Sequence, residues 1–242
     1  MNSSVREFVD RSVEPNIIGF LHVPETSNQH GLVLTHGAGG NAQAPLLRAL
    51  ADTFAEGGYI VLRCNLPYRQ ARVFGPPGPG DAARDRAGLK NALAAVKGIL
   101  DGSSLAASDE ALVSQGGEPK SWGQVFLGGH SYGGRQASIL CAEEPDLVSG
   151  LLLLSYPLHP PRRPEQQRTQ HLPDLRTPTL FVHGTRDPFG TVDELERAIK
   201  MIPAKTKLLT VEGAGHDLGF KGKAKKEELT VQILSEFGKL LP

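Results

Sequence analysis

Short apolar runs alternate with amphipathic stretches along this chain of 242 residues, and this alternation constrains the fold more than any other feature. The apolar runs are too short to be helices and are rich in Val, Ile and Leu, which favours strands. The predicted strands are 17–23, 32–35, 59–63, 125–127, 151–155, 179–183 and 207–211.

Between most of these runs the apolar residues recur at the spacing of a helix face. The predicted helices are 44–55, 83–100, 135–143, 192–201 and 225–241. Strands that alternate with helices form a parallel sheet covered on both faces, which explains why the strands are almost wholly apolar. The pattern therefore predicts an α/β fold with a mostly parallel sheet.

The beginning of the chain departs from this pattern. Runs 17–23 and 32–35 are joined by PETSNQHG, which has no helical character. We therefore expect these two strands to pair as an antiparallel hairpin at one edge of the sheet. No repeat or break in composition divides the chain, so we expect one domain over residues 1–242.

Charge and composition exclude several classes of function. The 26 basic residues balance the 26 acidic ones. The chain therefore lacks the excess of basic residues that is typical of a protein that binds nucleic acid or an anionic membrane. The two cysteines have no metal-site spacing, so we expect buried thiols. The N-terminus has no signal-like apolar segment and the run 150–158 is too short to span a bilayer, so we expect a cytoplasmic protein. Its oligomeric state is left open.

The motif GGHSYGGR at 128–135 marks the candidate nucleophile. Ser131 follows the strand 125–127 and precedes the helix 135–143, the context in which Gly-x-Ser-x-Gly forms a sharp turn that exposes a reactive serine. Side chains at the two flanking glycine positions would collide across such a turn. An ordinary glycine-rich loop is the alternative.

A serine hydroxyl is a weak nucleophile and needs a base that an acid orients. Asp187 follows the strand 179–183 in GTRDPFG, and His216 follows the strand 207–211 in EGAGHDLG. Catalytic groups in such sheets gather at the carboxyl ends of the strands, so Ser131, Asp187 and His216 are predicted to meet there. Taken alone, the aspartate would be read as a turn residue. His36 is expected to be structural.

The segment THGAGGN at 35–41 has two interpretations. It lies where backbone N–H groups hold an oxyanion, and we predict that Ala38 and Tyr132 donate them. The spacing Gly37-x-Gly39-x-x-Ala42 also matches a dinucleotide-binding fingerprint. That reading requires an acidic residue at the end of the next strand, where the sequence has Arg-Cys-Asn instead, so we disfavour it.

Three long segments, 67–81, 102–123 and 156–178, are predicted to be irregular. None is long enough for a large helical lid, although the third has the length of a small flap. Arg69, Tyr156 and His159 are candidate substrate contacts, since these loops follow strand ends and arginine suits an anionic group. Solvated basic loops are the alternative.

The segments THGAGG, GGHSYGGR, HGTRDPFG and GAGHDL, in this order, resemble the α/β-hydrolase superfamily, and SYPLHPP at 155–161 resembles small hydrolases related to dienelactone hydrolases. The resemblance implies a single-domain α/β-hydrolase fold with an eight-stranded, mostly parallel sheet. It also implies Ser131 as nucleophile, His216 as base and Asp187 as its orienting acid, with no metal or organic cofactor. Dienelactone hydrolases use cysteine as nucleophile, so their substrate does not carry over.

These features predict a serine hydrolase that cleaves a small carboxylic ester or related acyl compound through Ser131, His216 and Asp187. Its expected partner is a small-molecule acyl substrate, with neither nucleic acid nor membrane. The alternative is a non-catalytic interaction protein built on the same fold.

Overall fold

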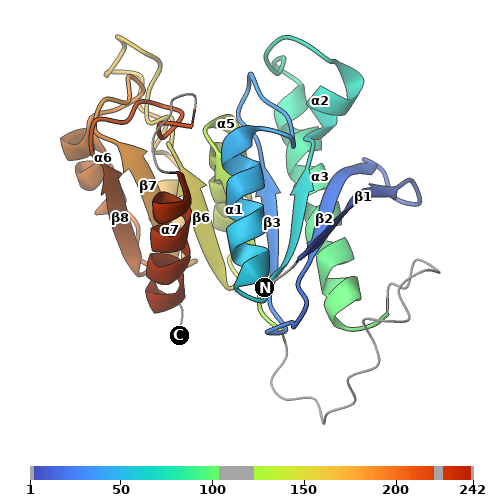
Figure 1. Ribbon diagram of the computed structural model, residues 1–242. Coiled ribbons are helices and arrows are strands. Elements are labelled where there is room, and N and C mark those ends of the chain that lie inside the picture. The colour runs from blue at the N-terminus through green and yellow to red at the C-terminus, as the bar shows by residue number, and fades with distance from the viewer. Residues whose placement is uncertain (1–2, 104–122, 221–225, 241–242) are drawn as a thin grey trace.

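The computed structural model describes residues 3–103, 123–220 and 226–240 (Figure 1). Its strands are β1 (Ser4–Asp10), β2 (Ile17–Val23), β3 (Gly31–Thr35), β4 (Ile60–Cys64), β5 (Val125–His130), β6 (Gly150–Leu154), β7 (Thr179–Gly184) and β8 (Thr206–Val211). Its helices are α1 (Pro45–Glu56), α2 (Pro67–Ala71), α3 (Asp81–Leu100), α5 (Tyr132–Glu143), α6 (Val192–Ile199) and α7 (Lys226–Leu240), with a 3₁₀ turn η1 (Leu172–Asp174).

The eight strands form one sheet in the order β1-β2-β4-β3-β5-β6-β7-β8. The six strands from β4 to β8 in this order are parallel, and β2 is antiparallel to both of its neighbours. Every residue of β3, β4, β6 and β7 is buried, as expected for strands covered on both faces. The predicted eight-stranded, mostly parallel α/β fold is confirmed.

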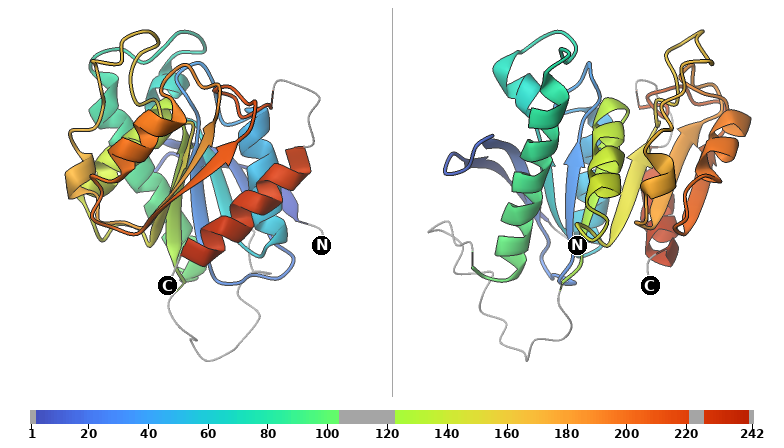
Figure 2. Two further views of the ribbon diagram at one scale, coloured as in Figure 1. Left: turned by 90° about the vertical axis from the view of Figure 1, so that its left-hand side faces the viewer. Right: turned by 180° about the vertical axis from the view of Figure 1, so that it is seen from behind.

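Helices cover both faces of the sheet and divide the core in two. Helices α1 and α7 pack on one face, and α3, α5 and α6 pack on the other (Figures 1 and 2). The first layer centres on Leu47, Phe54 and Phe237, and the second on Leu89 and Leu140. Each helix therefore buries the apolar face that its sequence period predicted.

The predicted hairpin between 17–23 and 32–35 is wrong. β4 lies between β2 and β3, pairing antiparallel with the first and parallel with the second. The connection crosses the start of β4 because Asn28 bonds to Gly57 and Gly58 and the His30 carbonyl accepts from Ile60 N at 2.9 Å. Asn28 and His30 belong to the connection between β2 and β3, and they bond to the chain around the start of β4. The connection therefore does not fold back as the tight turn of a hairpin.

The partner of β2 at the sheet edge is β1, which sequence reasoning missed. The register pairs Ser4 with Val23 and Asp10 with Ile17. β1 has no fully buried residue, and Val5 and Val9 are each 48% exposed. An edge strand with this much solvent contact lacks the continuous apolar run that marked the other strands.

The irregular segments are partly ordered by short helical turns. Segment 67–81 contains α2, and segment 156–178 contains η1. Most of segment 102–123, residues 104–122, lies outside the described residues.

Candidate active site

Ser131 lies on the turn between β5 and α5, in the strained conformation that the motif predicts. Its φ of 51° is rare for a residue with a side chain, and its N–H is held by the Leu154 carbonyl at 2.8 Å. A Cβ on Gly129 would lie 2.5 Å from Gly134 N, and one on Gly133 would lie 2.5 Å from the His36 carbonyl oxygen. Both flanking glycines are therefore required by close backbone contacts.

His216 joins Ser131 to Asp187 through two hydrogen bonds. His216 Nδ1 lies 2.8 Å from Asp187 Oδ2, and its Nε2 lies 2.8 Å from Ser131 Oγ. Because a carboxylate only accepts, Nδ1 carries the proton and Nε2 is left to accept from the serine hydroxyl. The Asp187 side chain is fully buried, whereas that of His216 is 23% exposed. The three residues that the sequence singled out are thus brought together.

Tight packing between two loops fixes this alignment. A Cβ on Gly184, at the end of β7, would lie 2.3 Å from the Ala214 carbonyl oxygen, and Arg186 N donates to the same oxygen at 2.9 Å. Asp187 Oδ1 accepts from Phe189 N at 2.9 Å, which orients the carboxylate from its other side. The loops after β7 and β8 therefore hold each other as a unit.

The neighbouring histidines have structural contacts. His130 Nε2 donates to the His216 carbonyl oxygen at 2.7 Å, and burial lowers the pKa of His130 to about 4. His36 is fully buried, accepts from Leu66 N through Nε2 at 3.1 Å, and has a pKa lowered by burial to about 4. His183 Nε2 donates to the Gly190 carbonyl oxygen at 2.8 Å. His36 thus makes the buried contacts expected of a structural residue.

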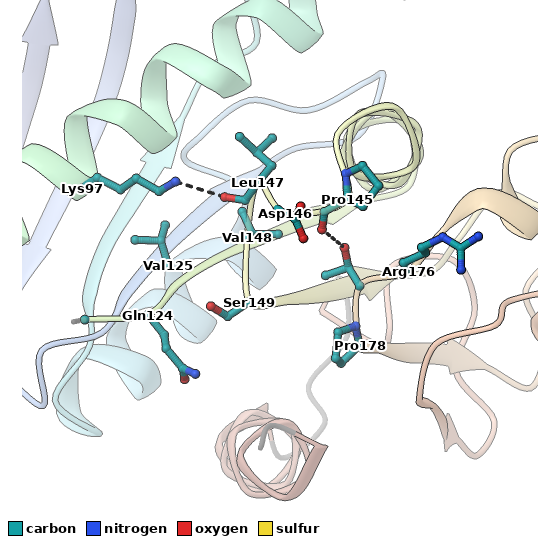
Figure 3. Close-up of a pocket in the computed structure, with 12 residues that line it drawn as sticks. Lys97, Gln124, Val125, Pro145, Asp146, Leu147, Val148, Ser149, Arg176 and Pro178 are labelled. Atoms are coloured by element: carbon teal, nitrogen blue, oxygen red, sulfur yellow. Dashed lines mark hydrogen bonds between the residues drawn. The ribbon is translucent and has the colours of Figure 1, made fainter. Parts of the chain in front are cut away.

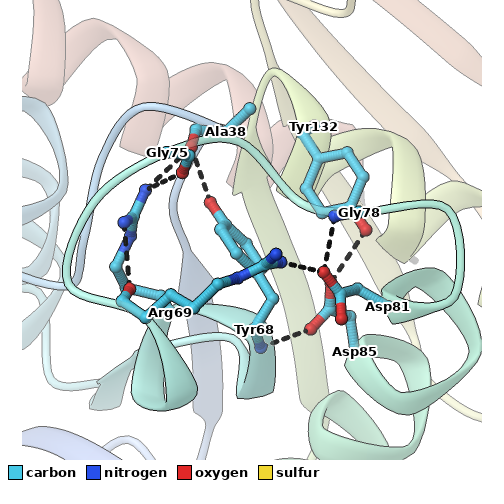
Figure 4. A network of polar contacts seen from close by, with 9 residues as sticks. Ala38, Tyr68, Arg69, Gly75, Gly78, Asp81, Asp85 and Tyr132 are labelled. Carbon is cyan, nitrogen blue, oxygen red and sulfur yellow. Dashed lines mark hydrogen bonds and ion pairs between the residues drawn. The ribbon is translucent and has the colours of Figure 1, made fainter.

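Residues 37–40 form a turn after β3, here called the oxyanion turn after the role predicted for Ala38, and its carbonyl groups are bound from the side of α2. Tyr68 Oη donates to the Ala38 carbonyl oxygen at 2.8 Å and to that of Gly37 at 3.2 Å (Figure 4). Arg69 donates to the carbonyl oxygens of Ala38 and Gly40 at 2.9 and 2.8 Å. Ala38 N–H lies in the same trans peptide as the Gly37 carbonyl and points the opposite way, so the bond from Tyr68 to Gly37 directs Ala38 N–H away from Tyr68.

Asp85 is a site residue that sequence reasoning missed. Its fully buried carboxylate accepts from Tyr68 N at 3.0 Å and from Tyr132 Oη at 2.7 Å (Figure 4). Burial raises the pKa of Asp85 above its ordinary value. Asp85 therefore links the residue that binds the oxyanion turn to the residue that follows Ser131. A carboxylate on the inward face of the helix 83–100 was the signal available in the sequence.

A cavity of about 650 Å³ lies beside Ser131. Its lining includes Ser131, His216, the oxyanion turn and the start of α1. Its apolar wall is formed by Leu46, Leu47, Pro188, Phe189 and Phe220. The Phe189 ring lies 4.2 Å from that of His216, between centroids. No helical lid inserted into residues 3–103, 123–220 or 226–240 covers this cavity.

The three predicted substrate contacts lie outside this cavity. Arg69 is buried, and backbone carbonyls occupy its guanidinium. Tyr156 is 1% exposed and donates to the Arg168 carbonyl oxygen at 2.6 Å. His159 is buried beside Glu194. The segment 156–178 contributes no lining residue, because its side chains bond within the segment and to α6.

A second cavity, of about 540 Å³, lies at the amino ends of β5 to β7, at the opposite end of the strands (Figure 3). Lys97 Nζ donates to the Leu147 carbonyl oxygen at 3.2 Å, and Thr177 Oγ1 donates to that of Pro145 at 3.3 Å. These side chains fasten loops together. None of the predicted site residues lies in this cavity.

The described part of the chain has neither a membrane-spanning helix nor a cluster of metal ligands. None of its helices combines the length and apolar character needed to cross a membrane. Within the same residues, no three His, Cys, Asp or Glu side chains gather in a group that could hold a metal ion. Cys64 and Cys141 are buried free thiols, as predicted.

Comparison with known proteins agrees with this architecture. Residues 100–237, more than half of the chain, match the family described as the alpha/beta hydrolase domain. A dienelactone hydrolase from Anabaena variabilis is 19% identical, with a TM-score of 0.71 and full coverage of both chains. An α/β serine hydrolase homologue from Coxiella burnetii is 17% identical over 96% of each chain, with a TM-score of 0.67. A lidless α/β serine hydrolase from Xanthomonas campestris is 14% identical over 100% of this chain and 96% of its own, with a TM-score of 0.67. The chain belongs to the α/β-hydrolase family.

Proposed function

We propose that this protein is a serine hydrolase that cleaves small, neutral carboxylic esters or related acyl compounds. One observation carries the proposal: Asp187, His216 and Ser131 form a continuous hydrogen-bonded chain that ends at a serine in a strained turn beside a cavity. Strained backbone conformations of this kind persist only where the surrounding structure enforces them, and they cluster at active sites. The nucleophile, base and orienting acid of acyl transfer are the roles that fit these three groups.

In this mechanism His216 Nε2 takes the proton of Ser131 as Oγ attacks the carbonyl carbon of the substrate. Asp187 holds the imidazole in the required tautomer and stabilises its cationic form. The protonated histidine then gives its proton to the leaving alcohol, and an acyl-enzyme remains on Ser131. Water, deprotonated by His216, attacks this ester and releases the acid, which restores the serine hydroxyl.

The N–H groups of Ala38 and Tyr132 are the proposed donors to the oxyanion, each worth about 3 kcal/mol of barrier. Tyr132 is the first residue of α5, where N–H groups have no acceptor within the helix. Ala38 N–H is oriented by the bond from Tyr68 to the Gly37 carbonyl, which shares its peptide plane, and the bonds to the Ala38 carbonyl hold the next peptide. Both donors are backbone groups, so the preorganisation of the oxyanion site depends on the contacts that hold the backbone in place.

The cavity wall favours a neutral substrate. Its side chains from α1 and from the loops around His216 are mostly aliphatic, proline and phenylalanine, and the carboxylate that joins them, Asp217, would repel an anion. Apolar surface of this kind binds hydrocarbon by removing it from water. The arginine predicted to contact an anionic group is occupied by backbone carbonyls, which removes the reason to expect an acidic substrate.

Labelling with a fluorophosphonate probe tests the proposal. The chain offers a matched control, because Ser138 Oγ also lies 2.8 Å from a histidine nitrogen, His171 Nε2. Ser138 is fully buried and donates to the Arg135 carbonyl oxygen at 3.0 Å, whereas Ser131 lines the cavity. We expect wild type and Ser138→Ala to be labelled and Ser131→Ala to remain unlabelled.

The rate at which each protein hydrolyses a short ester should parallel its labelling, and Ser131→Ala should lose on the order of 10⁶ in kcat. A folded wild type that neither labels nor hydrolyses would refute the proposal and favour a non-catalytic protein. Labelling that survives in Ser131→Ala would place the nucleophile elsewhere.

A further inference from the structure

A third, smaller hollow of about 290 Å³ adjoins the cavity beside Ser131 through the oxyanion turn, since Ala38 and Gly39 line both. We call it the lateral groove. Its lining residues are Ala38, Gly39, Arg69, Val73, Phe74, Gly75 and Pro76. One wall is therefore the oxyanion turn, and the other is the loop that follows α2.

Arg69 ties the two walls of this groove together. A guanidinium has five N–H groups, and here they make five hydrogen bonds to backbone carbonyls. The acceptors are the carbonyl oxygens of Gly40, Ala38, Arg72, Val73 and Gly75, at 2.8, 2.9, 3.1, 2.7 and 2.9 Å respectively. Two of these carbonyls belong to the oxyanion turn and three to the opposite loop. Arg69 thus holds the two walls of the groove together, and none of its N–H groups is left to bind a ligand.

The loop held by Arg69 presents apolar side chains to solvent. Val73 is 75% exposed and Phe74 is 86% exposed, the two largest exposures among the large hydrophobic residues described. Exposed valine and phenylalanine are unfavourable in water, and a cluster of them at the rim of a binding site indicates a surface that a ligand covers. The carbonyl bonds to Arg69 hold this pair beside Ala38.

The sheet order decides which part of a substrate reaches this groove. The loop after β4 and the oxyanion turn after β3 lie on one side of β5, which precedes Ser131, and the loop after β8, with His216, lies on the other. The leaving oxygen must lie beside His216 Nε2 to receive its proton. The alcohol part therefore extends towards His216, and the acyl part extends the opposite way, over the oxyanion turn.

We propose that the lateral groove binds the distal part of an apolar acyl chain, so that the protein prefers esters whose acyl group is long enough to pass Ala38 and Gly39. This inference rests on the proposed function and adds the substrate class to it. An acetyl group ends at the oxyanion turn, whereas a longer alkanoyl or arylalkanoyl chain continues onto Val73 and Phe74 and removes them from water.

Two series of esters test this assignment. The first keeps 4-nitrophenol as the alcohol and lengthens the acyl group from acetyl through butanoyl to octanoyl. The second keeps the acetyl group and enlarges the alcohol from methanol to benzyl alcohol. The variants are the double substitution Val73→Ser with Phe74→Ser and the control Val231→Ser, which replaces a valine that is 58% exposed on α7. All of the replaced side chains are exposed, so the fold is expected to persist.

Wild type is expected to prefer octanoyl over acetyl esters, and the double variant to lose about tenfold of that preference in kcat/KM, with acetyl esters changed less than about twofold. The control is expected to match wild type. Equal losses at every chain length, a loss that follows the alcohol instead, or an unchanged preference would each overturn the groove assignment. A wild type inactive on both series and unlabelled by fluorophosphonate would instead refute the proposed function.

Discussion

Replacement of Tyr68 by phenylalanine isolates the contribution of the contacts behind the oxyanion turn. The substitution removes one hydroxyl, which donates to the carbonyl oxygens of Ala38 and Gly37 at 2.8 and 3.2 Å, and keeps the buried ring. Neither carbonyl is left without a donor, because Arg69 still bonds to Ala38 and Gly40 N still bonds to Gly37. The change therefore loosens the turn without leaving a buried acceptor unpaired.

Loss of the Tyr68 hydroxyl is expected to lower the unfolding free energy and to raise the activation barrier by different amounts. Loss of one hydrogen bond with its partners still satisfied should cost about 1 kcal/mol of unfolding free energy, or roughly 2–4 °C in Tm. A complete loss of the Ala38 donor would cost about 3 kcal/mol of barrier, near a hundredfold in kcat. Because Arg69 still holds the turn, we expect about half of that energy, near tenfold in kcat, with KM almost unchanged.

Tyr156→Phe is the matched control, since Tyr156 is equally buried and its hydroxyl also donates to a backbone carbonyl, that of Arg168, at 2.6 Å. Steady-state hydrolysis of a short ester and thermal unfolding are measured for both variants. Tyr156→Phe should lose at least as much stability as Tyr68→Phe, because it removes the Tyr156 donor from the Arg168 carbonyl, and only Tyr68→Phe should lose kcat. Equal kcat values for the two variants, or a loss confined to KM, would refute the reasoning.

Three further predictions follow from the same contacts. Asp187→Asn should keep the fold but lower kcat by about 10⁴, because an amide favours the wrong tautomer of His216; unimpaired turnover would contradict this. Gly133→Ala should destabilise the protein by about 1–3 kcal/mol, seen as a lower urea midpoint, since its Cβ meets the backbone of His36 at 2.5 Å. The pKa values of His36 and His130, lowered to about 4, should make stability fall as pH drops below 6.5, because the unfolded chain binds the protons. Between pH 7.5 and pH 5 this amounts to about 2 kcal/mol for each histidine, and urea unfolding that does not vary with pH would exclude it.

Local chemistry explains which features could be predicted from the sequence. Apolar runs and helical periods depend on residues within one element, so the order of strands and helices was readable. The turn at Ser131 was readable for the same reason, because its glycines act over five consecutive positions. Asp187 and His216 could be named because the carboxyl ends of parallel strands share one edge of the sheet.

Long-range pairing decided the features that were missed. Whether β3 pairs with β2 or with β4 depends on where the intervening chain crosses, and the bonds of Asn28 to Gly57 and Gly58 settle this. β1 is found only as the partner of β2, since its exposed residues carry a weak apolar pattern.

The sequence by itself determined an α/β fold with a serine turn and with Ser131, Asp187 and His216 at strand ends. Only the tertiary structure decided that Arg69 braces two loops through its guanidinium, and that Asp85 joins Tyr68 to Tyr132. The reason is physical: these side chains bond largely to backbone groups, some of them on loops distant in the sequence, and every residue carries such groups. No pattern of side chains along the chain encodes those contacts, so they became visible only once the loops were in place.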